Sequence, residues 1–131
     1  MENSPLRPLV WMGVSKKEFR QFPKEVTRVM GFRMFLVQTD QEVPGERPLT
    51  GGALKGLGIR EIRDDYDRDT YRVVYTVKLT HAVYVLNAFK KKSKFGISTP
   101  MHEIELVRQR YLKAVAMDAA QQPTGNRGSD R

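Results

Sequence analysis

The stretch Gly58–Lys94, GIREIRDDYDRDTYRVVYTVKLTHAVYVLNAFKKKSK, decides which fold this sequence favours. Two of its runs, Tyr71–Lys78 and Ala82–Phe89, are rich in Val, Tyr, Thr and Phe, the residues that suit a half-buried strand. The link between them, Leu79–His81, has the length of a hairpin loop. Gly58–Arg63 is a third and shorter run, followed by a polar loop. Consecutive strands with short links mostly pair in antiparallel order, so we predict a small antiparallel sheet.

The charged residues of this predicted sheet fall on defined faces, because side chains alternate along a strand. Arg72 lies opposite the more apolar face of its run, which is formed by Tyr71, Val73, Tyr75 and Val77. Glu61 and Arg63 share one side of the first run, and the last run leads into Lys90–Lys92. Two interpretations stay open on these residues alone: a solvated sheet face, or a platform that binds a polyanion.

A length of 131 residues predicts one domain with a single core. We place this domain at residues 9–117, after a frayed segment at residues 1–8 that holds two prolines. The polar sequence of residues 118–131, rich in Gly, Pro and Ser, predicts a disordered tail.

Charge and cysteine content limit the function. A net charge of +8 is high for so small a domain and favours nucleic acid or another acidic surface as partner. The absence of cysteine excludes disulfides, thiolate metal sites and a cysteine nucleophile, and it fits a reducing compartment. No apolar run approaches the roughly 20 residues of a membrane span, and no signal peptide is evident, so we expect a cytoplasmic protein.

The segment before the sheet predicts a short strand and two helices. Leu9–Met12 reads as the strand, and Ser15 reads as a helix N-cap with Glu18 three residues later. Pro23 suits the first position of a second helix. The part Phe32–Leu36 of that helix is apolar almost all round, which favours deep burial, the alternative being a surface kept for a protein partner.

A glycine- and proline-rich loop and a last helix frame the sheet. The loop covers Gln41–Gly56, with Leu54 expected to reach the core. Ser98 or Thr99 can cap the last helix, and Pro100 suits its first position. This helix has one apolar stripe, formed by Ile104, Val107, Tyr111 and Val115.

Nucleotide-binding and metal motifs are absent from the sequence, since it has no Walker loop, no GxGxxG and no HExxH. His81 and His102 lack metal-ligand spacing. The simpler interpretation is that His81 is a turn residue and that His102 lies in the solvated first turn of a helix. What remains is Arg and Lys, which bind phosphate. RNA that is cleaved by its own 2′-hydroxyl needs only an aligned phosphate and stabilisation of its growing charge, which a fixed Arg72 could supply. The proton acceptor stays open between Lys, Tyr, His and a carboxylate.

Four segments together resemble the RelE/HigB superfamily of bacterial toxins, and most closely its phage-associated HigB-like branch: LKGLGIREIR, TYRVVYTV, AVYVLNAFKKKSK and TPMHEIELVRQRYL. The resemblance covers Leu9–Val115. It implies an α/β (α+β) domain in which N-terminal helices pack on a small, twisted, mainly antiparallel sheet and a C-terminal helix lies near its edge. It also implies ribosome-dependent endoribonuclease action on mRNA in the A site, without metal or cofactor, and an antitoxin, often of helix-turn-helix type, in a complex that can be of higher order.

The resemblance also implies roles for individual residues. Arg72 matches the strand arginine that contacts the scissile phosphate, and Arg63 and Lys91 match further basic positions of the catalytic cluster. His102 is the candidate acid or base, although neither it nor Phe95 clearly matches the family residue that follows the basic exit. The expected RNA-binding residues are Lys55, Arg60, Lys90, Lys92 and Lys94.

This assignment makes two demands and leaves alternatives. Arg72 and the lysines after Phe89 must lie on one side of the sheet, and Arg72→Ala should abolish growth arrest while the fold stays intact. Glu61 stands where some relatives carry lysine, which puts the proton-transfer step in question. The alternatives are a non-catalytic protein that binds RNA or the ribosome, and a degenerate toxin that acts with its antitoxin as co-repressor.

Overall fold

The predicted strands form the centre of a five-stranded sheet in the computed structural model, which describes residues 6–92 and 101–121. The sheet order is β1-β5-β4-β3-β2, and its neighbouring strands are antiparallel except for the parallel pair β1 and β5. In chain order the elements are β1 (Leu9–Trp11), α1 (Ser15–Arg20), α2 (Lys24–Gln38), β2 (Glu46–Pro48), η1 (Gly52–Leu54), β3 (Ile59–Tyr66), β4 (Asp69–Thr76), β5 (Val83–Lys92) and α3 (Met101–Ala119). The α+β class and the mainly antiparallel sheet are confirmed.

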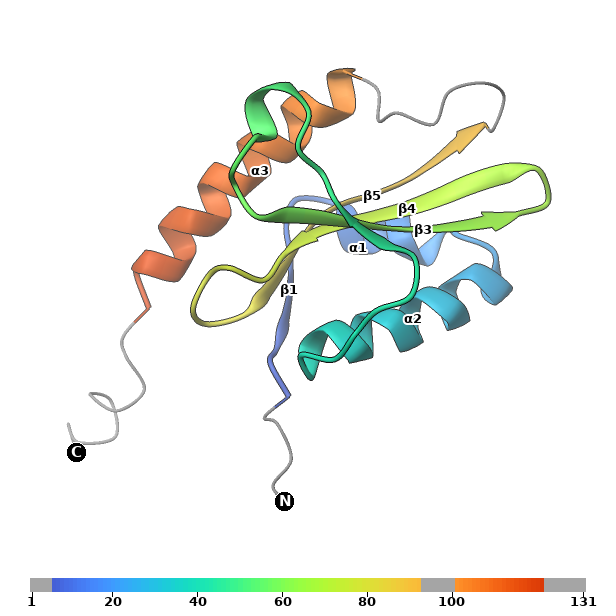
Figure 1. Ribbon diagram of the computed structural model, residues 1–131, viewed down its shortest axis with the longest axis horizontal. Coiled ribbons are helices and arrows are strands. Elements are labelled where there is room, and N and C mark those ends of the chain that lie inside the picture. Colours follow the sequence, from blue (N-terminus) through green and yellow to red (C-terminus); the bar gives the residue numbers. More distant parts are fainter. Residues whose placement is uncertain (1–5, 93–100, 122–131) are drawn as a thin grey trace.

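Helices cover both faces of the sheet: α1 and α2 lie on one side and α3 on the other (Figure 1). Two hydrophobic clusters result from the strand alternation. The first joins α2 to alternate sheet residues, among them Val26, Met30, Met34, Ile62, Val73, Tyr75, Val83 and Val85. The second joins α3 to the opposite positions, among them Ile59, Val74, Tyr84, Leu86, Val107 and Ala114. The C-terminal helix therefore closes the second face instead of lying only at an edge.

A β-bulge interrupts the alternation in β5. Val74 pairs with Asn87 and Tyr75 pairs with Val85, so the register skips Leu86. An extra residue of this kind turns the following side chains to the other face. The residues after the bulge that face α3 are consequently Asn87, Phe89 and Lys91, the odd-numbered ones.

Arg110 of α3 binds the bulge. Its Nη1 donates to the carbonyl oxygen of Leu86 at 2.9 Å and to Oδ1 of Asn87 at 3.1 Å. The guanidinium passes over Gly13, where a Cβ would stand 2.6 Å from Nε of Arg110 and φ is +57°. Gly13 is therefore required both for this turn and for the close approach of the arginine.

Two predictions for the helices need correction. Ser15 does not cap α1: Val14 precedes the helix without a side-chain cap, and Oγ of Ser15 donates to the carbonyl oxygen of Val85 at 3.3 Å. Deep burial of the apolar segment of α2 is wrong for Phe32 and Phe35, which are exposed, although Met34 between them is buried.

The loop after α2 contains β2 and η1, and Leu54 is fully buried as expected. The predicted cap Ser98–Pro100 lies outside the described residues.

Residues that we predicted to lie in the two flexible ends belong to the folded domain. Nη2 of Arg7 donates to the carbonyl oxygens of Val77 at 2.9 Å and Leu79 at 3.0 Å, so Arg7 is held by the loop between β4 and β5. The helix α3 extends to Ala119, and Asp118, which we had assigned to the tail, is buried. Its carboxylate accepts hydrogen bonds from the backbone N–H groups of Thr80 and His81 and from the hydroxyl of Tyr84.

None of the helices in the described ranges has the length and hydrophobicity of a bilayer span.

Candidate functional site

Three cations that the sequence singled out share the face of the sheet that is turned toward α3. Arg63 of β3 lies directly opposite Arg72 of β4 in the strand register. Thr70, two positions before Arg72 and so on the same side, lies opposite Lys91 of β5. The bulge in β5 causes this arrangement, because uninterrupted alternation from Tyr84 would have turned Lys90 to this face instead.

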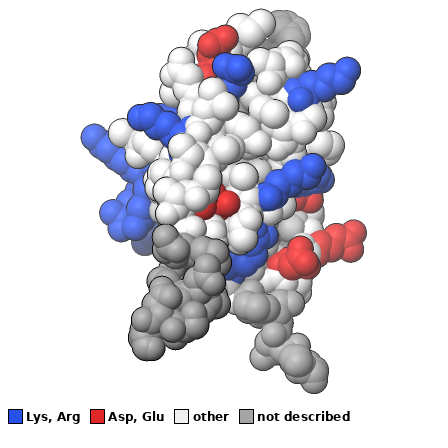
Figure 2. All heavy atoms as spheres, turned by 90° about the vertical axis from the view of Figure 1, so that its left-hand side faces the viewer, with Lys and Arg blue, Asp and Glu red and all other residues white. Residues whose placement is uncertain are grey.

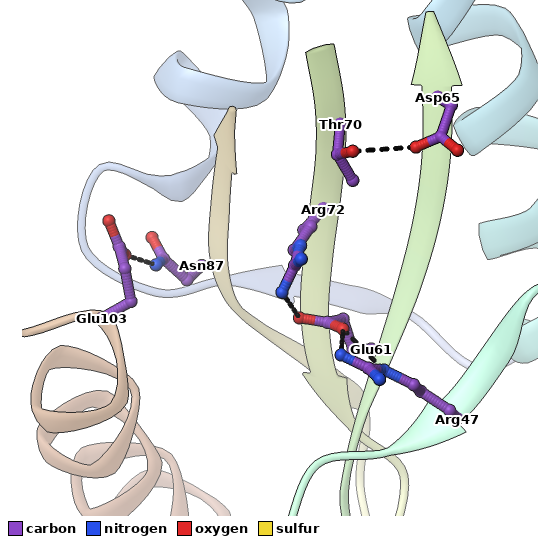
Figure 3. A network of polar contacts seen from close by, with 7 residues as sticks. All are labelled: Arg47, Glu61, Asp65, Thr70, Arg72, Asn87 and Glu103. Atoms are coloured by element: carbon purple, nitrogen blue, oxygen red, sulfur yellow. Dashed lines mark hydrogen bonds and ion pairs between the residues drawn. The ribbon is translucent and has the colours of Figure 1, made fainter. Parts of the chain in front are cut away.

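Arg72 lies at the centre of a buried ionic network. Its side chain is 1% exposed, and its Nη1 is 3.4 Å from Oε2 of Glu61, which is fully buried. Nε and Nη2 of Arg47 both stand 3.0 Å from the other oxygen of Glu61, so two guanidinium groups meet one carboxylate (Figure 3). A buried charge requires such partners because leaving water costs it several kcal/mol.

The surroundings of Arg72 act on its protonation. Burial lowers the pKa of Arg72, the carboxylate of Glu61 opposes this, and the nearby charges of Arg63 and Arg47 lower the pKa further. Arginine starts from so high a pKa that it stays charged. The ring of Phe89 also lies beneath the guanidinium, with its centroid 6.0 Å from Cζ. Arg72 is thus a fixed positive charge below the surface, whereas Arg63 and Lys91 are only partly buried.

Further polar side chains border this network, and the sequence reasoning had missed them. Oγ1 of Thr70 donates to Oδ1 of Asp65 at 2.8 Å, and Asn87 donates to Glu103 at the start of α3 (Figure 3). Arg47 was hidden because its strand, which ends in Pro48, read as loop. The sequence placed Glu61 on the side of Arg63 and marked it as a departure from the family pattern, but did not indicate its pairing with Arg72 and Arg47.

His102, the expected acid or base, is exposed in the first turn of α3. Its Nε2 stands 3.3 Å from Oε2 of Glu103. Because Glu103 contacts Asn87 on the same sheet face as Arg72, His102 is next to a residue at the border of the network. No group of three or more His, Asp or Glu suited to hold a metal ion occurs among the residues that the structure describes.

The structure separates the other predicted residues from this face. Arg60 and Lys90 lie on the opposite side of the sheet, where Arg60 is 2.7 Å from Glu46 and Lys90 is 3.6 Å from Asp69. Lys55 is exposed directly after η1. Lys92 ends β5 without a described side chain, and Lys94 and Phe95 lie outside the described residues.

A hollow of about 380 Å³ opens beside the ionic network. Its lining is formed by Gly45, Glu46, Arg47, Arg63, Asp64 and Asp65. Burial raises the pKa of Asp64, the charge of Arg33 opposes this, and Asp65 raises it further. The lining holds three carboxylates beside two guanidinium groups, of which Arg47 is paired with Glu61, so the group suited to a phosphate beside a proton acceptor is Arg63.

The charges on the side of the molecule at the left of Figure 1 do not form one continuous patch. Figure 2, which views that side, shows some Lys and Arg gathered at its left edge and others separated by uncharged surface and a few acidic residues. The overall positive charge therefore does not locate a binding site, and the candidate site is defined by Arg63, Arg72 and Lys91 on the sheet face.

Comparison with known proteins identifies one relationship. Residues 17–112 match the model of a family described as phage-derived Gp49-like proteins. The matched span runs from α1 into α3 and includes Arg63, Arg72 and Lys91. No curated protein and no solved structure matches the chain.

Proposed function

The chain belongs to the phage-derived Gp49-like family, a toxin-like group related to RelE and HigB, and from this membership we propose that it is the toxin of a type II toxin–antitoxin system. We further propose that it belongs to the phage-associated HigB-like branch and cleaves mRNA on the translating ribosome. The observation that carries the proposal is the placement of Arg63, Arg72 and Lys91 on one face of three adjacent strands.

In the proposed reaction the RNA supplies its own nucleophile. The 2′-oxygen forms a bond to phosphorus as the bond to the 5′-oxygen breaks, which leaves a 2′,3′-cyclic phosphate and a 5′-hydroxyl. Arg63 and Lys91 hold the phosphate, while Arg72 contributes positive charge from below as negative charge grows in the transition state. Such a fixed charge acts strongly because the protein interior screens it less than water does.

One proton must leave the 2′-hydroxyl and one must reach the departing 5′-oxygen. Asp65 follows Arg63 by two residues in β3 and so lies on the same side of that strand. Its carboxylate, or the imidazole of His102 beside Glu103, is the proposed proton acceptor, and the proton taken up there is passed to the departing 5′-oxygen directly or through water. The reaction as proposed requires no metal and no cofactor.

The burial of Arg72 favours a second candidate, a protein that binds RNA or the ribosome without cleaving it and acts with an antitoxin as co-repressor. A phosphate cannot touch a guanidinium that is 1% exposed unless the site opens. In that case Glu61 neutralises Arg72 permanently, and the surface residues bind RNA on their own.

Mapping of RNA 5′ ends by primer extension after induction separates the two candidates. The nuclease gives codon-aligned 5′ ends that disappear when translation is blocked, and the binder gives none. Arg63→Ala should lower cleavage about 100-fold by removing a phosphate contact made in the transition state. Arg60→Ala is the matched control, because this arginine lies in the same strand on the opposite face.

Equal cleavage by the Arg63→Ala variant and the wild type would exclude the proposed site. Arg72→Ala, the variant suggested by the sequence, also alters a buried ionic network. Its effect on growth arrest is therefore interpretable only beside its thermal melting curve.

A further inference from the structure

The outer side of α2 carries large apolar side chains that nothing in the described chain covers. Phe32 is 61% exposed, Phe35 is 46% exposed and Val29 is 37% exposed, whereas Met30 and Met34 on the inner side are buried. We call Arg28, Val29, Phe32 and Phe35 the α2 ridge. Exposed apolar side chains gathered in one place are typical of interaction sites.

The ridge has the shape of a helix-binding surface. Arg28, Phe32 and Phe35 follow at i, i+4 and i+7, so they form one stripe along α2. Gly31 lies beside this stripe, and a Cβ there would meet nothing within 4 Å. The missing side chain leaves a notch in which the backbone of another helix can approach closely.

The charges along the ridge select the partner. Lys24 and Arg28 are exposed on successive turns. Glu25, next to Lys24 in sequence, lies near Tyr66, and its negative charge and its hydrogen bond with the hydroxyl raise the pKa of that tyrosine. The ridge thus offers a partner aromatic rings beside two exposed cations. Arg and aromatic residues are also the types that dominate binding energy at protein interfaces.

We propose that the α2 ridge is the docking surface for an acidic amphipathic helix of the antitoxin, an inference that rests on the proposed function. The apolar side of that helix covers Val29, Phe32 and Phe35, and its carboxylates pair with Lys24 and Arg28. The ridge lies on the other side of the sheet from Arg63, Arg72 and Lys91 (Figure 1). An antitoxin helix docked there leaves the face with Arg63, Arg72 and Lys91 uncovered. Substitutions can therefore alter antitoxin binding and RNA cleavage independently.

The test uses the full chain and the purified antitoxin encoded beside its gene. Phe32→Glu should weaken binding in calorimetry about 100-fold, because it removes an anchor and repels the acidic helix. Arg28→Glu should weaken binding about tenfold, and less so at high salt. Leu112→Glu is the matched control: this side chain is 49% exposed on α3, and its variant should bind like the wild type.

Unchanged antitoxin binding by Phe32→Glu would overturn the proposal. So would a dimer of the chain alone, measured by light scattering, that Phe32→Glu converts to monomer, because the ridge would then bind a second copy. Growth arrest without antitoxin distinguishes this proposal from the proposed function. A Phe32→Glu variant that arrests growth and resists rescue supports both, while a wild-type chain that binds through the ridge but never arrests growth supports the docking surface alone.

Discussion

The two faces of the sheet are built from different kinds of side chain. The face under α1 and α2 is lined by apolar and aromatic residues: Ile62, Tyr71, Val73, Tyr75, Val83, Val85 and Ala88. The face under α3 carries, besides its apolar cluster, most of the buried polar side chains of the described residues: Glu61, Thr70, Arg72, Thr76 and Asn87. One fold thus closes a sheet in two ways: mainly by apolar contact under α1 and α2, and with a fully buried ion pair under α3.

The difference indicates which face serves a purpose besides stability. Apolar burial contributes about 25 cal/mol per Å² with no need for partners. Buried ion pairs often contribute nothing compared with apolar residues of similar size, because desolvation offsets their attraction. The network of Arg47, Glu61 and Arg72 is therefore a costly way to fill space, and its position beside Arg63 and Lys91 favours a functional reason.

Glu61→Ala should have the largest effect on stability. It leaves the buried guanidinium of Arg72 without its carboxylate, which costs about 3–5 kcal/mol in the free energy of unfolding. Urea denaturation measures this loss. The double variant Glu61→Leu with Arg72→Met should recover most of the stability, because it replaces the pair by apolar groups, but it should not cleave RNA.

Met30→Ala provides the matched change on the other face. This fully buried methionine packs under α2, and its truncation should cost about 2–5 kcal/mol. The folded fraction of this variant should cleave RNA normally, unlike the stable double variant. If the double variant keeps its activity, the polar face has no catalytic role and the comparison fails.

Strand composition was enough to predict the three central strands, and alternation indicated which side chains share a side within each run. That Arg63 and Arg72 share one side follows only from the pairing of β3 with β4. Composition and alternation were not enough for Lys91, because a bulge at Leu86 inverts the alternation, and the hydrogen bond at the bulge comes from Arg110, 24 residues away. The family resemblance, not the pattern, indicated Lys91. Its orientation could only come from the paired strands.

The helices show a similar limit. The apolar segment of α2 has large side chains on all sides, and periodicity does not tell which side a sheet will cover, so the burial of Phe32 was predicted wrongly. Asp118 looked like the first residue of a polar tail because its partners are far away in sequence, 38, 37 and 34 residues before it. Local composition describes a segment accurately only where no distant group binds it.

Asp118→Asn should have an intermediate effect, and one that depends on pH. Burial opposes ionisation of Asp118, but the N–H groups of His81 and Thr80 and the hydroxyl of Tyr84 outweigh it and hold the pKa below its ordinary value. The ionised group therefore stabilises the fold above about pH 4, and this stabilisation is lost as the pH falls through the lower pKa of the folded state.

At pH 7 the loss of these charge-assisted hydrogen bonds should cost about 2 kcal/mol in urea denaturation. The difference between this variant and the wild type should shrink below about pH 4, where both side chains become neutral. Glu105→Gln, an exposed change on the same helix, should show neither effect. A difference that stays constant with pH would mean that the carboxylate charge is not involved.

The smallest expected effect is on RNA cleavage by variants of two adjacent lysines, Lys90 and Lys91, which lie on opposite faces of the sheet. Lys91→Ala should lower cleavage about tenfold, or about 1.4 kcal/mol, because Lys91 shares the face of Arg72. Lys90→Ala should change it less than about twofold, since Lys90 lies on the other face beside Asp69 and affects RNA only at long range. Single-turnover cleavage of ribosome-bound mRNA measures both. The reverse order would mean that RNA approaches from the side of α1 and α2, and the ionic network would then be a structural feature alone.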